Sequence, residues 1–200
     1  MTSGWRNDKR QFERVLQKSF DLMAILAIPL FFGAQFLADR LMTLVAGSDF
    51  AASGPVLRIL ILAASIIFVG TMFSHAVIAV DKQRKIIGAY FFVAVTALAG
   101  YLILIPRYSY FGAAWMTIYS ELSIALASGW LVWRTSAFYP NLRIAGKALL
   151  ACLPMSAWLF YAGSLNLWLV IIIACLVYFI ALYLIKGITR QDVLTLMARE

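Results

Sequence analysis

The sequence predicts an all-α polytopic membrane protein with six transmembrane helices and both termini in the cytoplasm. Hydrophobic residues make up 64% of the 200 residues, and the mean hydropathy of +0.89 lies outside the usual range of soluble domains. Long stretches without charge recur at the length of a bilayer span, about 20 residues for roughly 30 Å of hydrocarbon. Basic residues collect in alternate connections between these stretches.

The membrane domain is expected over residues 20–186, between a lead at 1–19 and a tail at 187–200. Its six spans are predicted at about 20–40, 56–80, 86–105, 109–133, 145–162 and 167–186. The last two come from one uncharged stretch of about twice the length of a span. Gly163, Ser164 and Asn166 near its middle predict a tight turn between two helices.

All but three of the 17 Lys and Arg residues fall on one side of this pattern. They are Arg6, Lys9, Arg10, Arg14, Lys18, Lys82, Arg84, Lys85, Arg134, Arg143, Lys147, Lys186, Arg190 and Arg199. Cationic loops resist translocation, so this side is predicted to be cytoplasmic. Arg40, Arg58 and Arg107 are the cations of the outer side.

The lead and the tail are both expected to be helical. Trp5, Phe12 and Phe20 among basic residues suit a short interfacial helix before the first span, which is expected to remain as a membrane anchor. Thr189, with Asp192 three residues later, predicts a capped cytoplasmic helix at the end of the chain.

Three local signals shape the predicted spans. Pro29 in the middle of the first span predicts a kink, which is either static or a hinge. Residues 106–109 predict a tight outer turn between the third and fourth spans. Residues 112–114, Gly-Ala-Ala, then give the fourth span a small-residue surface that a neighbouring helix can approach closely.

Glu121 is the sharpest single candidate for a functional residue, because a carboxylate in the middle of a span is costly unless it is paired, protonated or hydrated. At about 100° per residue, one helical face carries it together with small and polar residues, namely Tyr110, Ala114, Thr117, Ala125 and Ser128. Such a stripe suits a water-filled cavity with a proton-exchanging carboxylate, or a polar contact with a neighbouring helix.

The remaining polar candidates have two interpretations each. His75, the one histidine, either titrates in concert with Glu121 or forms a hydrogen bond between helices. The three outer arginines either bind phosphate groups of a substrate, with Arg58 the best placed at the start of the second span, or extend to lipid headgroups.

Several function classes are disfavoured by composition. The net charge of +8 is segregated by loop and comes without a nucleic-acid-binding motif, which indicates topology and contact with anionic lipids. Cys152 and Cys175 lie in spans without metal-ligand spacing and are expected to pack as small apolar residues. No catalytic or cofactor motif is present, so an enzyme, a bound metal or a cofactor is not expected.

The stretch from Leu104 to Ala114, LIPRYSYFGAA, followed by Thr117 and Ser120-Glu121, resembles a signature of polysaccharide flippases. These are the O-antigen and capsule exporters of the multidrug/oligosaccharidyl-lipid/polysaccharide superfamily. Segments around Pro29, Gly47–Ala51, Arg58 and 77–85 also resemble the family. Family sequences often carry glycine at the positions of Asp81 and Ser109.

The resemblance implies the C-terminal portion of a flippase that moves a lipid-linked oligosaccharide across a bacterial or archaeal cytoplasmic membrane for polysaccharide biosynthesis. It implies a missing N-terminal lobe or a second chain as partner, with Arg58 and Glu121 facing or bordering the cavity between lobes. An ion-coupled drug or small-solute antiporter and a non-transporting membrane scaffold are the alternatives.

Overall fold

The computed structural model describes residues 9–162 and 165–187, which confirm the all-α prediction. Five helices in this part are long and apolar enough to cross a membrane. They are α2 (Lys9–Ala46), α3 (Gly54–Ala79), α4 (Gln83–Ser136), α5 (Arg143–Tyr161) and α6 (Leu167–Leu184), with the short 3-10 helix η1 (Ser48–Ser53) between α2 and α3.

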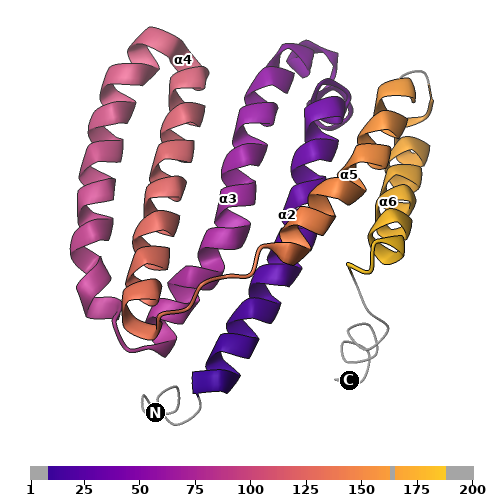
Figure 1. Cartoon of the computed structure of the whole chain (residues 1–200). Coiled ribbons are helices and arrows are strands. Elements are labelled where there is room, and N and C mark those ends of the chain that lie inside the picture. Colours follow the sequence, from indigo (N-terminus) through magenta and orange to yellow (C-terminus); the bar gives the residue numbers. More distant parts are fainter. Residues whose placement is uncertain (1–8, 163–164, 188–200) are drawn as a thin grey trace.

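Helix α2 lies at the centre of the arrangement and separates two buried clusters (Figure 1). On one side it packs against α3, which in turn packs along α4, and this cluster includes Phe20, Val77 and Val132. On the other side it packs against α5, with α6 beyond, around Cys152 and Tyr178. Cys152 is buried as a packing residue, whereas Cys175 is exposed on α6.

Helix α4 is two helical arms, residues 83–108 and 110–136, that fold against each other at Ser109 (Figure 1). The two arms are joined by hydrogen bonds between the hydroxyls of Thr96 and Tyr119 at 2.9 Å and of Tyr101 and Thr117 at 3.3 Å. The break therefore lies inside the predicted turn at 106–109. η1, this break, the end of α5 and the start of α6 all lie at one end of the molecule.

Ser109 has φ 51° and ψ −135°, a backbone conformation that favours glycine. We expect Ser109→Gly to raise the free energy of unfolding by about 1 kcal/mol, because glycine adopts this conformation without a Cβ clash. SDS titration of the purified protein, followed by circular dichroism, measures the change. Ser123→Gly, inside the second arm, is the control and should lower stability by roughly 0.5 kcal/mol. Equal losses in both variants would contradict the left-handed turn.

The described part of the N-terminal lead is helical. From Lys9 onwards it belongs to α2, one continuous helix of 38 residues and about 57 Å that runs directly into the first apolar stretch. The reason is that Leu16 and Phe20 are buried against α3 and α4, so that one apolar face continues without a break into the span. The predicted tail helix lies, from residue 188, outside the described residues.

Candidate functional site

The polar stripe of the second α4 arm faces neighbouring helices over most of its length. Thr117 bonds to Tyr101 of the first arm, and Ala125 lies against Gly70 of α3, where an added Cβ would approach to 2.9 Å. Ala114 is buried, whereas Tyr110, at the end of the stripe, is exposed. The stripe is therefore largely a contact surface between helices.

Ser128 is the most enclosed polar residue of the stripe, with a relative exposure of 0%. Its hydroxyl lies 3.1 Å from that of Tyr90 on the first arm and 3.4 Å from that of Ser74 on α3. Tyr90 also donates to Ser74 at 3.3 Å. Three hydroxyls from three helical segments thus satisfy one another, which removes the cost of burying each alone. Ser74 and Tyr90 were not predicted from the sequence.

Glu121 lies half-buried between these two polar contacts, one turn from Thr117 and two turns from Ser128. No hydrogen bond or ion pair joins its carboxylate to another side chain within residues 9–162 and 165–187. Glu121 is the carboxylate of the stripe, and it has no hydrogen bond or ion pair in the described part of the chain.

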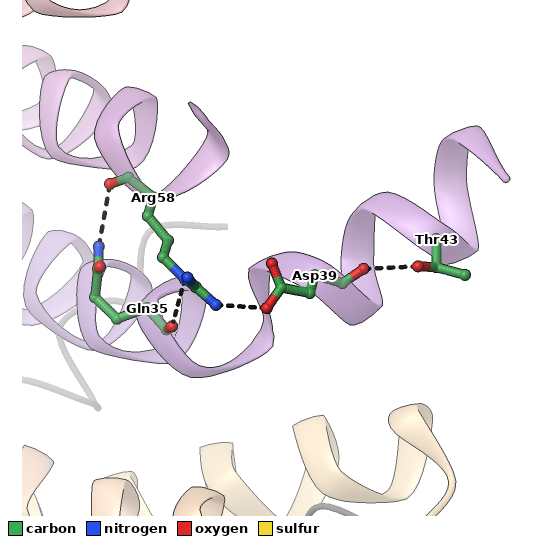
Figure 2. A network of polar contacts seen from close by, with 4 residues as sticks. All are labelled: Gln35, Asp39, Thr43 and Arg58. Atoms are coloured by element: carbon green, nitrogen blue, oxygen red, sulfur yellow. Dashed lines mark hydrogen bonds and ion pairs between the residues drawn. The ribbon is translucent and has the colours of Figure 1, made fainter. Parts of the chain in front are cut away.

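Arg58 is bound to α2 rather than free, as Figure 2 shows. Its guanidinium donates to the carboxylate of Asp39 at 2.5 Å and to the carbonyl of Gln35 at 3.1 Å. The side-chain amide of Gln35 donates in turn to the carbonyl of Arg58 at 3.1 Å. About a third of the Arg58 side chain remains exposed, at 36%. Any phosphate at Arg58 must share the guanidinium with Asp39.

Gly54 explains how Asp39 comes so close to the start of α3. A Cβ at position 54 would lie 1.7 Å from a carboxylate oxygen of Asp39, so a larger residue would displace this carboxylate. Pro55 follows in the first turn of the helix, where its missing N–H costs no hydrogen bond. The Gly-Pro start of α3 thus sets the distance between Arg58 and Asp39.

The other predicted candidates are not brought to one place. Arg40 donates to the carbonyl of Leu165, which fixes α2 to the start of α6. Arg107 is exposed near the α4 break. His75 is exposed on α3, next to the inward-facing Ser74, and the described residues provide it with neither the expected hydrogen bond between helices nor one to Glu121.

Pro29 has a partner that the sequence did not reveal. Proline has no N–H, so the carbonyl of Ile25, four residues earlier, lacks its helical hydrogen bond. The hydroxyl of Tyr178 on α6 donates to this carbonyl at 2.8 Å. Tyr178 is 1% exposed, so the contact is enclosed. Helix α2 stays helical through Pro29, and α6 supplies the missing donor.

We expect Tyr178→Phe to cost about 1–2 kcal/mol of stability, because it leaves the Ile25 carbonyl buried without a donor. In a Pro29→Ala background the restored amide N–H can bind the same carbonyl, so the Tyr178→Phe cost should fall. A double-mutant cycle by SDS titration measures a coupling of about 1 kcal/mol. If Tyr178→Phe costs the same in both backgrounds, the proposed link between Tyr178 and Pro29 is wrong.

Residues 9–162 and 165–187 contain no group of three His, Cys, Asp or Glu side chains that could hold a metal ion. Comparison of the chain with protein-family models, curated proteins and solved structures gave no match. The functional conclusion therefore depends on the residues and their geometry alone.

Proposed function

We propose that the chain is the C-terminal portion of a flippase that moves lipid-linked oligosaccharide across the cytoplasmic membrane. The observation that carries the proposal concerns Asp81 and Ser109, the two positions where flippase sequences often have glycine. Both adopt positive φ, 55° and 51°, the conformation that favours glycine. At Asp81 and Ser109 the chain departs from the family pattern, and at both positions the backbone adopts a conformation that favours the glycine of the family.

The signature around residue 112 has a comparable physical role. Gly112 lies so close to the first α4 arm that an added Cβ would be 2.5 Å from the carbonyl oxygen of Leu104. The Gly-Ala-Ala of the signature is therefore a place where two arms meet backbone to backbone. This contact supports the proposal because it gives the signature a structural reason. Its small residues are needed where the two arms of the helical hairpin pack against each other.

In the proposed membrane arrangement the two α4 arms cross separately, which gives six crossings with both termini in the cytoplasm. The supporting feature is the position of the basic connections 82–85 and 134–143, which lie at the end where α2 begins (Figure 1). Arg58 would then lie at the outer surface and Glu121 within the bilayer.

Transport requires a second helical bundle. Alternating access moves one bundle against another around the substrate site, and this proposal assigns the second bundle to another lobe or another chain. The lipid tail of the substrate would remain in the bilayer while the sugar crosses between the bundles. The phosphate of the substrate would replace the carboxylate of Asp39 at Arg58, and Glu121 would take up and release a proton.

Deletion of the chain in its source organism tests the proposal. We expect lipid-linked oligosaccharide to accumulate on the cytoplasmic face and the surface polysaccharide to be lost, as measured by lipid extraction and by glycan labelling of intact cells. Restoration of both by the intact gene is the control. Normal surface glycan with a loss of resistance to organic cations would instead support an antiporter, which the unpaired Glu121 also suits.

A third outcome favours a scaffold. Deletion would then leave both glycan export and drug resistance normal, and the ion pair of Arg58 with Asp39 would be a purely structural contact. An immunoblot of native membranes, with an antibody against residues 187–200, adds independent information. A band of about twice the mass of this chain is the result expected for a two-lobed transporter.

A further inference from the structure

A surface groove lies between the first turns of α2 and the segment that joins α4 to α5. Its volume is about 460 Å³. Seven residues line it, namely Arg10, Glu13, Arg14, Gln17, Ala137, Phe138 and Tyr139. It is at the opposite end of the molecule from the Arg58–Asp39 ion pair and forms no part of the candidate site described above.

The groove is held together by contacts between distant parts of the chain. The side chain of Gln17 donates to the carbonyl of Asn141 at 3.0 Å and accepts from its backbone N–H at 2.8 Å. The same amide donates to Asp21 at 2.8 Å. Phe138 is 7% exposed and belongs to the cluster around α2 and α3. The walls of the groove therefore have a fixed relative position.

The charge of the groove is positive. Arg10 and Arg14 are four residues apart on one helical face. Neither has a hydrogen bond or an ion pair among the described residues. Glu13, which also lines the groove, has its carboxylate 3.7 Å from the ammonium group of Lys9. Among the described residues these two arginines therefore have no counter-ion, and the neighbouring Glu13 carboxylate already pairs with Lys9.

The depth of the groove is that of lipid headgroups. Arg14 lies six residues, or about 9 Å, before Phe20, where the first apolar span begins. Tyr139 packs on Trp133 with ring centroids 5.8 Å apart, and Arg134 lies 5.3 Å over the ring of Trp130. Aromatic and basic residues of this kind gather where the hydrocarbon meets the headgroups.

An exposed apolar strip leads from the groove along the second α4 arm. Trp133, Trp130 and Leu126, at helical spacing, are 42%, 53% and 64% exposed. A soluble anion gains no favourable contact from such an apolar surface, whereas the acyl chain of a lipid can pack along it. We propose that the groove binds an acidic phospholipid, its phosphate at Arg10 and Arg14 and an acyl chain along this strip. Basic pockets between helices at the cytoplasmic face bind acidic headgroups in this manner.

Native mass spectrometry of the purified full chain in detergent tests this site with dioleoylphosphatidylglycerol, against dioleoylphosphatidylcholine as the neutral lipid. The chain should bind the acidic lipid more tightly. In the double variant Arg10→Gln/Arg14→Gln the Kd for phosphatidylglycerol should rise roughly tenfold or more, because two charge-assisted phosphate contacts are lost. The control Arg84→Gln/Lys85→Gln removes the same charge elsewhere and should change the Kd less than about twofold.

Three results would overturn the proposal. They are equal losses of affinity in both double variants, equal binding of the two lipids, and displacement of the lipid by inorganic phosphate at equal concentration. Arg10→Lys/Arg14→Lys, which keeps the charge, provides the second comparison if the glutamine variant does not fold, and it should retain selectivity for the acidic lipid. The assay measures binding alone, so its result is independent of whether the protein transports a glycan.

Discussion

Gly112→Ala is expected to lower the free energy of unfolding by about 3 kcal/mol, the largest loss we predict for a single methyl group in this chain. The added Cβ would lie 2.5 Å from the carbonyl oxygen and 2.6 Å from the carbonyl carbon of Leu104. Both atoms are backbone, so relief requires that the two α4 arms move apart. That movement would weaken the hydrogen bond of Tyr101 to Thr117 as well.

Two other glycines of α4 provide matched controls for the SDS titration. Gly88 has nothing within 4 Å of an added Cβ, so Gly88→Ala should be neutral or stabilise the helix by up to about 1 kcal/mol. At Gly100 the obstacle is the tip of Met116, which can rotate, so Gly100→Ala should cost about 1 kcal/mol. A Gly112→Ala protein as stable as Gly88→Ala would show that the arms do not touch there.

Under the proposed flippase function, Glu121→Gln is expected to reduce the transport rate roughly tenfold or more, while the melting temperature stays the same or rises. The reduction follows if Glu121 exchanges a proton during transport, because glutamine keeps the shape of the side chain but cannot ionise. Stability should not fall, since the carboxylate has no partner among the described residues to lose, and a neutral amide costs less than a carboxylate at the proposed position within the bilayer.

Measurement of glycan export and melting temperature in the same preparations separates a role in transport from one in folding. Glu121→Asp, which keeps an ionisable group, should retain part of the transport rate. Ser123→Ala, two residues away on another face of the same arm, should leave the rate unchanged. A Glu121→Gln protein that is stable and fully active would exclude proton exchange at this position.

The all-helical fold and the hairpin of α4 could be predicted because local sequence patterns indicate them. Uncharged stretches located the helices, and residues 106–109 located the turn whose backbone breaks at Ser109. Small residues at 112–114 indicated a close approach, and Gly112 makes one with Leu104. The lead was expected to be helical, but its sequence did not reveal that Leu16 and Phe20 pack against α3 and α4.

Most of the candidate site could not be predicted, since its contacts join residues far apart in the chain. Tyr178 meets Ile25 across 153 residues of sequence, and Gln17 meets Asn141 across 124. Nothing in the neighbouring sequence marks Tyr178 as the donor that Pro29 makes necessary. Arg58 was expected to bind substrate phosphate or lipid headgroups, and the structure pairs it with Asp39 of the same chain.

Helix α2 connects the two surfaces of the protein mechanically. Arg14 in the lipid groove and Asp39 beside Arg58 belong to one unbroken helix and are about 38 Å apart along its axis. Rotation of this helix by about 10° around its midpoint would shift Arg14 and Asp39 by roughly 3 Å, in opposite directions. Pro29 and the Tyr178–Ile25 contact lie near that midpoint, so they would lie close to the centre of such a rotation. Binding of a lipid in the proposed groove would thus alter the geometry of the Arg58–Asp39 ion pair at the other end of the helix.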